Sequence, residues 1–416
     1  MDRITQLRIK NVRAFEDVTI DLSPDVTVLI GENGSGKSTI IECLTLLRRS
    51  VEPSFVDQLY NIHRGLPGLL RSGAAGLQLG VLVRDDEEKK PPVYYAFALA
   101  RQGSGVSVAA ESLVELDLVK KTSRHLLVRN RSKHVAIQPG STELVPLPSA
   151  LSDEGRLAIN GLASPESAAP FRRVVEVLGG IEAHVGLDTL AAWASQSIQR
   201  PSPMRDPSLL RPADRLSLLG HNLASAWHEL KNRPSAHWDE TLGLVRLGLG
   251  QHVDSVRVAL DPGGGHGALY LHLVNIDGPI PAANLSDGQL SWLAYVAMAR
   301  LGGARSLLAV DEPELHLHPA LLGRVISMLT SLDDRSQVVL GTHSDRVLEL
   351  LDDPADAVRV LSLDGNRALV SRLDEAELGR WLEEFGDLGQ IRANGYLPRV
   401  TAREAATTGP DVGGAG

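Results

Sequence analysis

Apolar side chains take every second position near the start of the chain, on both sides of a polar bend at Arg13–Asp17. This alternation over residues 4–22 is typical of two strands joined by a turn. Val26–Ile30 is apolar throughout and predicts a buried strand that leads into a glycine-rich turn. Beyond the turn the apolar positions follow helical spacing and predict an amphipathic helix that continues through Arg48; they are Ile40, Ile41, Leu44 and Leu47.

The middle of the chain changes pattern twice. Strand-like runs at Leu77–Val83, Val93–Ala100 and Leu126–Val128 predict an antiparallel sub-sheet. Residues 141–250 combine helical patterns, at Val174–Leu178 and Asn222–Leu230, with proline-rich punctuation at 201–212. This combination predicts a helical insertion.

Strand patterns return after the insertion. Val253–Leu260 and Leu269–Ile276 are linked by DPGGGHG, whose glycines predict a hairpin turn. Residues 284–345 follow the order helix, strand, helix, strand, which predicts a parallel α/β sheet. A closing hairpin is expected over Val358–Leu363 and Ala368–Leu373, and the final ATTGPDVGGAG is expected to be disordered.

These patterns predict an α/β fold with four parts. They are an N-terminal lobe at 1–140 with the antiparallel sub-sheet, the helical insertion at 141–250, a C-terminal lobe at 251–375, and a C-terminal helix with its tail at 376–416. At 416 residues the chain exceeds what one hydrophobic core usually organises.

The composition limits the partners and the cellular compartment that we expect for this protein. A net charge of −9 argues against a protein that coats nucleic acid through its overall field. The single cysteine, Cys43, cannot form an intrachain disulfide, which suits a reducing compartment. The charged N-terminus does not resemble a signal peptide, and no window approaches the ~20 apolar residues of a membrane span. We expect a soluble cytoplasmic protein with no membrane partner.

The glycine-rich turn carries the first chemical signal. The string GENGSGKST lies between the predicted strand and helix, which is the context of a phosphate-binding loop; its residues are Gly31, Glu32, Asn33, Gly34, Ser35, Gly36, Lys37, Ser38 and Thr39. The glycines let backbone N–H groups face a phosphate, and Lys37 is expected to reach the β- and γ-phosphates. Ser38 is expected to ligate Mg²⁺, and Thr39 to lie near the α-phosphate.

Two later strands end in side chains that complete such a site. Leu307–Val310 leads into Asp311, a candidate ligand for Mg²⁺, and Glu312, a candidate base for the attacking water. The next strand runs into His343, which can contact the γ-phosphate. A lone histidine is often a surface residue, but ligands collect at the carboxyl ends of parallel strands. These residues favour hydrolysis of ATP.

A third motif, LSDGQ, begins the helix between these strands, and it resembles the signature motif of ABC-class ATPases. In that class the motif binds the γ-phosphate of ATP held by the P-loop of another subunit. Ser286 offers a hydroxyl, Gly288 an unobstructed N–H, and the helix N-terminus a favourable field, with Gln289 following. The residues alone also allow a capped surface helix.

The narrower resemblance is to RecF-like and OLD-family ATPases of the ABC/SMC class, including stand-alone ATPases associated with phage defence. It rests on IKNVRAF at 9–15, GENGSGKST, NLSDGQ, DEPELHLHP at 311–319 and THSDRVL at 342–348, in family order. The resemblance implies that Arg13 faces the nucleotide and that Glu314–Pro319 forms a turn near the second site of a dimer.

Some assignments stay open within this resemblance. His316 and His318 have a spacing that metal ligands can share, although two such histidines alone make a poor zinc site. The glutamine of the family's Q-loop is either Gln58 or Gln78. The chain lacks the heptads and the cysteine pair of long coiled-coil relatives. Only 73 residues follow His343, so we expect no nuclease domain in this chain.

One basic segment is a candidate for contact with DNA. Its members, with no acidic residue among them, are Lys120, Lys121, Arg124, Arg129, Arg131 and Lys133. On an antiparallel sub-sheet these side chains could follow a nucleic-acid backbone. They could equally guard a solvated sheet edge.

Taken together, the sequence predicts a Mg²⁺-dependent ATPase that works as a head-to-tail homodimer with ATP between the protomers. Its role would be DNA maintenance or phage defence, and it would gate a separately encoded nuclease or toxin. One alternative is the ATPase subunit of a membrane transporter, which the HLHP run and the N-terminal hairpin disfavour. The other is an interaction module switched by ATP without hydrolysis.

Overall fold

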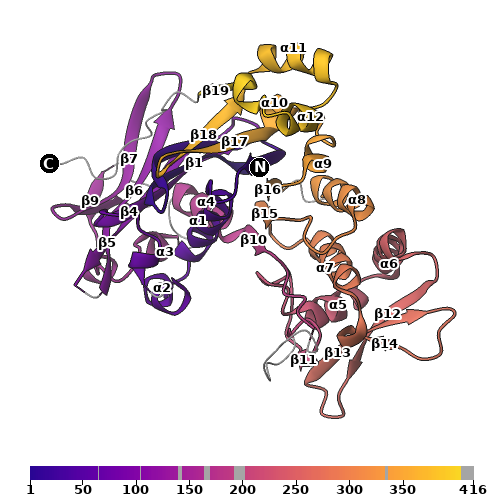
Figure 1. The fold of residues 1–416 in the computed structure, drawn as a ribbon. Helices are drawn as coiled ribbons and strands as arrows, with labels where there is room; N and C mark the ends of the chain where they lie inside the picture. The colour runs from indigo at the N-terminus through magenta and orange to yellow at the C-terminus, as the bar shows by residue number, and fades with distance from the viewer. Residues whose placement is uncertain are drawn as a thin grey trace.

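The computed structural model of this chain describes residues 1–63, 65–103, 105–138, 143–163, 169–191, 202–332 and 336–403. Its elements form three sheets with helices between and around them (Figure 1). The end of the chain that was expected to be disordered, ATTGPDVGGAG, lies outside the described residues.

A mixed seven-stranded sheet forms the centre of the molecule. Its order is β10 (Ile181–Val185), β15 (Leu307–Asp311), β16 (Gln337–Gly341), β3 (Val26–Gly31), β17 (Val358–Asp364), β18 (Arg367–Leu373) and β19 (Thr401–Arg403). The first five strands are parallel, and β17, β18 and β19 pair antiparallel. Strands covered on both faces are apolar throughout, and β15 is buried at all five positions.

The N-terminal lobe covers one face of this sheet. It contains an eight-stranded antiparallel sheet in the order β2 (Phe15–Asp21), β1 (Asp2–Val12), β4 (Gly76–Asp85), β5 (Val93–Gln102), β6 (Gly105–Asp117), β7 (Thr122–Arg129), β8 (His134–Ile137) and β9 (Leu144–Pro146). Helices α1 (Lys37–Ser50), α2 (Phe55–His63), α3 (Ile159–Leu162) and α4 (Ala169–Gly179) pack into the core on this side of the central sheet. One hydrophobic core joins both sheets through the apolar face of α1.

A second core covers the opposite face of the central sheet. It includes α5 (Leu223–Lys231), α6 (Ser235–Leu249), α7 (Asp287–Leu301) and α8 (Pro319–Thr330). A small sheet of β11 (Ser208–Leu209), β13 (His266–Leu273), β12 (Val253–Leu260) and β14 (Ile280–Pro281) packs beside these helices. Alternation along β15 divides the cores: Leu307 points into the first core and Leu308 into the second.

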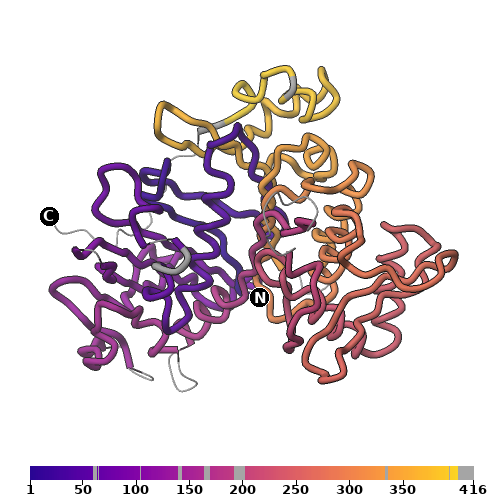
Figure 2. Tube along the Cα trace, turned by 60° about the horizontal axis from the view of Figure 1, so that its bottom comes forward, coloured from indigo at the N-terminus to yellow at the C-terminus, as the bar shows by residue number. Residues whose placement is uncertain are grey.

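The C-terminal helices lie together at the top of Figure 1 and in yellow in Figure 2. They are α10 (Pro354–Ala357), α11 (Glu375–Phe385) and α12 (Leu388–Ala393), and α12 packs against α9 (Asp345–Leu348). Short 3₁₀ turns occur at Leu66–Gly68, Ser149–Leu151, Ala282–Asn284 and Leu397–Val400.

The predicted α/β class with an antiparallel sub-sheet is confirmed, and so are both predicted C-terminal hairpins. The predicted helical insertion at 141–250 contains helices α3, α4, α5 and α6, but it also contains β10, which is an edge strand of the central sheet. This strand contains two polar residues, Glu182 and His184. Both are buried, because Glu182 accepts from Arg305 at 2.8 Å and lies 2.9 Å from His184. The domain boundaries stay predictions.

Candidate nucleotide site

The glycine-rich loop leaves the N-terminus of α1 open to an anion. Gly36 is the N-cap residue with φ of 109° and has no side chain to cap the helix, and the first turn holds no acidic residue. A Cβ on Gly36 would stand 2.7 Å from the ring of Phe15, so the tip of the β1–β2 hairpin sits directly against the loop. Helix N–H groups left without a side-chain cap bind phosphate well.

Lys37 closes the loop on itself. Its ammonium donates to the carbonyl oxygens of Gly31 at 2.9 Å and Glu32 at 3.2 Å. Burial lowers the pKa of Lys37 below its ordinary value, while the nearby charge of Asp311 raises it and that of Arg392 lowers it further. The two backbone carbonyls therefore hold the cation close to where a bound phosphate would need it.

The order of the central sheet brings the acidic residues to this loop. Strands β15, β16 and β3 are parallel neighbours, and Asp311 lies opposite Gly341 in the register. Burial raises the pKa of Asp311 above its usual range, although a hydrogen bond with Ser38 lowers it. The Oδ1 atom of Asp311 is buried without a hydrogen-bond partner among the described residues. A hydroxyl beside an unsatisfied carboxylate oxygen is a donor set suited to Mg²⁺.

Glu312 and His343 face each other beyond these ligands. Glu312 has φ of 49°, and its N–H donates to the Gly341 carbonyl at 2.7 Å. The Nε2 atom of His343 lies 3.8 Å from a Glu312 carboxylate oxygen, and each side chain is about a third exposed, at 34% and 36%. A strained backbone that aims a carboxylate into a site is a common feature of functional positions.

Glu314 fixes the loop that carries the histidine. Its carboxylate accepts from the Thr342 hydroxyl at 2.9 Å and from the His343 N–H at 2.7 Å. Arg392 of α12 donates to the His343 carbonyl at 3.4 Å and pairs with Asp345 at 3.0 Å. The sequence predicted that Glu314 lies in a turn but did not predict these hydrogen bonds, and no sequence pattern indicated Arg392.

Arg13 approaches the loop from the hairpin. Its guanidinium donates to the Thr39 hydroxyl at 3.4 Å and pairs with Glu42 at 2.7 Å. The residue is therefore next to the loop. Its direct contact with a nucleotide stays a prediction.

The signature loop is organised separately. Ser286 caps α7, its hydroxyl oxygen accepts from the Gln289 N–H at 3.2 Å, and the Gln289 side chain accepts from the Ser286 N–H at 2.9 Å. Gln289 is thus occupied in a capping box, and its predicted contact with nucleotide stays a prediction. A Cβ on Gly288 would stand 3.0 Å from the His316 carbonyl oxygen, so the loop packs against the turn after β15.

Several other candidates fall away from this cluster. Gln58 donates to Ser54 at 2.7 Å, and Gln78 is buried in β4, so the Q-loop glutamine stays unassigned. His318 accepts from the Ala320 N–H and caps α8. Among the described residues, no group of three or more histidine, cysteine, aspartate or glutamate side chains could hold a metal ion.

Arg129 is a correction to the predicted basic segment. It is 2% exposed, donates to the carbonyls of Asp153 and Arg156, and pairs with buried Glu111 at 3.7 Å. A buried, paired guanidinium is not available to DNA. The other members are exposed, but they lie at or beyond the two ends of β7, namely Lys120, Lys121, Arg124, Arg131 and Lys133.

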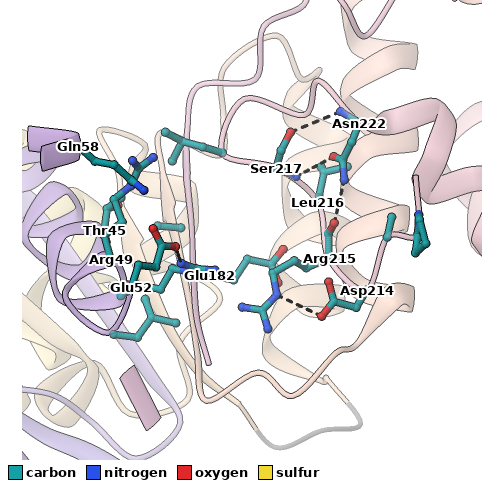
Figure 3. Close-up of a pocket in the computed structure, with 16 residues that line it drawn as sticks. Thr45, Arg49, Glu52, Gln58, Glu182, Asp214, Arg215, Leu216, Ser217 and Asn222 are labelled. Carbon is teal, nitrogen blue, oxygen red and sulfur yellow. Dashed lines mark hydrogen bonds and ion pairs between the residues drawn. The ribbon is translucent and has the colours of Figure 1, made fainter. Parts of the chain in front are cut away.

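A pocket of about 580 Å³ lies away from the phosphate loop (Figure 3). Figure 3 shows Arg49 and Glu52 on one wall and Ser217 and Asn222 on the other. The first wall includes the C-terminal half of α1 and Glu52 just after it, whereas the phosphate loop precedes the other end of this helix. This pocket is therefore distinct from the nucleotide site.

Comparison with known proteins supports this reading of the loop. Residues 26–349 match the family described as "AAA domain, putative AbiEii toxin, Type IV TA system". The chain belongs to this family. It is 27% identical over 387 residues to the molybdenum import ATP-binding protein ModC of Pseudomonas aeruginosa, across 88% of this chain and 92% of ModC. A 45-residue segment is 40% identical to the DNA replication and repair protein RecF of Staphylococcus carnosus, across 11% of this chain and 12% of RecF.

Solved structures show the same fold. An SMC head bound to the C-winged helix domain of ScpA superimposes with a TM-score of 0.54 at 14% identity, covering 90% of this chain and 99% of that one. An SMC head from Pyrococcus furiosus with an extended coiled coil gives 0.51 at 13% identity, covering 92% and 99%. The family match and the shared fold make this chain a P-loop ATPase, which binds and hydrolyses ATP. Within the described residues, no helix is long and apolar enough to cross a membrane.

Proposed function

We propose that two copies of this chain bind ATP and Mg²⁺ between them in a head-to-tail arrangement, in the cytoplasm. Lys37, Ser38, Asp311, Glu312 and His343 act from one protomer. Ser286 and Gly288 of the other protomer close over the γ-phosphate. Mg²⁺ would be held by Ser38 and Asp311, and it would neutralise charge on the phosphates.

In a single chain the phosphate loop and the signature loop each form only half of the proposed site. This observation carries the proposal. The Glu312 carboxylate and the His343 ring meet at the phosphate loop. The signature loop instead presents Ser286 and Asp287 to solvent. Within the described part of the chain the Ser286 oxygen accepts from the Gln289 N–H, and its hydroxyl proton can still be donated to a phosphate from outside.

Hydrolysis would then gate a partner. Closure with ATP and opening after hydrolysis give the protein two states that a separately encoded nuclease or toxin can distinguish. The family description names a toxin of a type IV toxin–antitoxin system, which supports a role in defence. The match to RecF supports the alternative of DNA maintenance.

The similarity to ModC raises the alternative of a transporter subunit. The large antiparallel sheet and the HLHP turn, which packs against Gly288 through His316, argue for the SMC and RecF side of the class. Purification with and without membranes tests this alternative, since a transporter subunit would co-purify with a membrane protein.

Mixing two inactive variants tests whether the site is shared. Lys37→Ala damages the phosphate loop, and Ser286→Arg blocks the signature. Each variant alone is expected to be inactive. An equimolar mixture forms heterodimers with one undamaged site, so turnover should reappear. A mixture as inactive as its components would contradict the shared site.

A second experiment addresses the biological role. ATP turnover is measured with and without single- and double-stranded DNA, and a pull-down in parallel looks for a co-encoded effector. Stimulation by DNA without an effector favours DNA maintenance. Capture of a nuclease or toxin that depends on ATP favours defence.

A further inference from the structure

A buried arginine holds the loop that begins α7. Arg205 is 4% exposed. Its Nη1 donates to the carbonyls of Leu285 at 2.7 Å, Ala282 at 3.1 Å and Ala283 at 3.3 Å, and its Nη2 donates to the Asp287 carboxylate at 2.6 Å. The guanidinium therefore binds the residues directly before and after Ser286.

The same side chain reaches back toward the central sheet. Its Nε donates to the Thr189 carbonyl at 2.7 Å. Thr189 follows β10, whose last residue, Val185, lies opposite Asp311 in the parallel register. Ser202 joins the two segments further, because its N–H donates to the Leu190 carbonyl at 3.1 Å and its carbonyl accepts from the Arg205 N–H at 2.8 Å.

One planar group thus connects the edge of the nucleotide sheet with the signature loop. A guanidinium has five donors in a fixed fork, so it can hold several carbonyls and a carboxylate at once in one geometry. The approach to α7 is a 3₁₀ turn at Ala282–Asn284, in which the Leu285 N–H donates to the Ala282 carbonyl at 3.2 Å. Arg205 binds three carbonyls of this turn and the Asp287 carboxylate, so it holds the chain on both sides of Ser286.

From these contacts we infer that Arg205 is a positioning residue of the signature loop, which sets Ser286 and Gly288 in the geometry that receives the γ-phosphate of the partner protomer. This inference rests on the shared site proposed above. The hydrogen bonds of Arg205 go to the signature loop and to the segment after β10, so we expect it to act without touching the nucleotide of its own protomer.

The structure supplies a matched control at the other end of the same helix. Arg233 donates to the carbonyls of Arg300 at 2.7 Å and Leu301 at 2.6 Å, where α7 ends. Both arginines bind backbone carbonyls of one helix or its approach. Only Arg205 lies at the signature end.

The first experiment compares Arg205→Ala, Arg205→Lys and Arg233→Ala in the full chain. For Arg205→Ala we expect unchanged affinity for ATP by fluorescent-nucleotide titration, loss of the ATP-dependent dimer, and a fall in turnover of about 100-fold, the scale of a misplaced catalytic group. Arg205→Lys should recover part of this loss. Arg233→Ala should lower the melting temperature yet keep the dimer. Normal turnover in folded Arg205→Ala would overturn the inference.

The second experiment asks in which protomer Arg205 acts. Arg205→Ala mixed with Lys37→Ala should regain turnover, because the heterodimer holds one site with an undamaged loop and an undamaged signature. If the Lys37→Ala and Ser286→Arg pair recovers and this pair does not, Arg205 does not act through the signature. If neither pair recovers, the shared site itself is wrong, and both proposals fail.

A second variant tests the inference if Arg205→Ala does not fold properly. If Arg205→Ala melts well below the wild type, Asp287→Ala replaces it, since this half-exposed partner, with 49% of its side chain accessible, can be removed from the surface. Asp287→Ala should weaken the ATP-dependent dimer while leaving ATP affinity unchanged. A full-strength dimer in Asp287→Ala would count against the inference.

Discussion

Removing the Glu314 carboxylate should slow hydrolysis without weakening ATP binding. The carboxylate holds the Thr342 hydroxyl at 2.9 Å and the His343 N–H at 2.7 Å, and the Thr342 side chain is fully buried. Glu314→Ala leaves both donors without this partner. His343 then loses its fixed position opposite Glu312.

The magnitude follows from the two hydrogen bonds. A hydrogen bond to a charged group contributes about 1.5–3 kcal/mol. If the lower value applies to each bond, about 3 kcal/mol of positioning energy is lost. Since about 1.4 kcal/mol corresponds to a tenfold change in rate, kcat should fall by roughly 100-fold.

A steady-state phosphate-release assay, with ATP affinity measured in parallel, checks this prediction. Glu314→Gln should retain most activity, because its amide oxygen can accept from His343 and its amide nitrogen can face the Thr342 oxygen. Glu349→Ala is a control for loss of a nearby carboxylate, since that side chain pairs only weakly with Arg346, at 3.9 Å. A kcat for Glu314→Ala close to that of Glu349→Ala would refute the reasoning.

Three further substitutions test other parts of the account. Gly36→Ala should weaken nucleotide binding by roughly tenfold in a fluorescence titration, because a left-handed φ of 109° costs a non-glycine residue about 1–2 kcal/mol; unchanged affinity would contradict the loop geometry. Asp311→Asn should raise the melting temperature of the nucleotide-free protein at neutral pH, because burial raises the pKa of this carboxyl and penalises its ionised form. This gain in melting temperature should shrink as the pH falls toward the carboxyl's ordinary pKa. In the same variant, the stabilisation that Mg²⁺ with ATP gives the wild type should disappear. Arg129→Met should lower the free energy of unfolding by about 3–5 kcal/mol in urea, because it leaves Glu111 buried without its counter-charge, whereas Lys133→Met should not.

The sequence predicted the parts of the site that are marked by a local pattern of residues. The loop at 31–39 joins a strand to a helix. The ends of two later strands are the places where the sequence has Asp311, Glu312 and His343. Parallel strands bring their carboxyl ends to one edge, so these residues could be placed together without a structure.

Residues that act through space could not be placed in this way. Arg392 reaches His343 from α12, and Arg205 reaches the signature loop across 80 positions of sequence. Neither has a local pattern that marks its target. Arg129 shows the converse error: its charged neighbours in sequence suggested a surface, but Glu111 lies opposite it on the adjacent strand and draws it inside.

The central claim is that ATP is held between two protomers and released by hydrolysis through Glu312. The most direct test is the mass in solution of Glu312→Gln, measured by light scattering without nucleotide, with ADP, and with ATP and Mg²⁺. The account predicts a species of twice the 44.7 kDa chain only with ATP, together with loss of turnover. A variant that stays monomeric with bound ATP, or that turns over ATP at the wild-type rate, would contradict it.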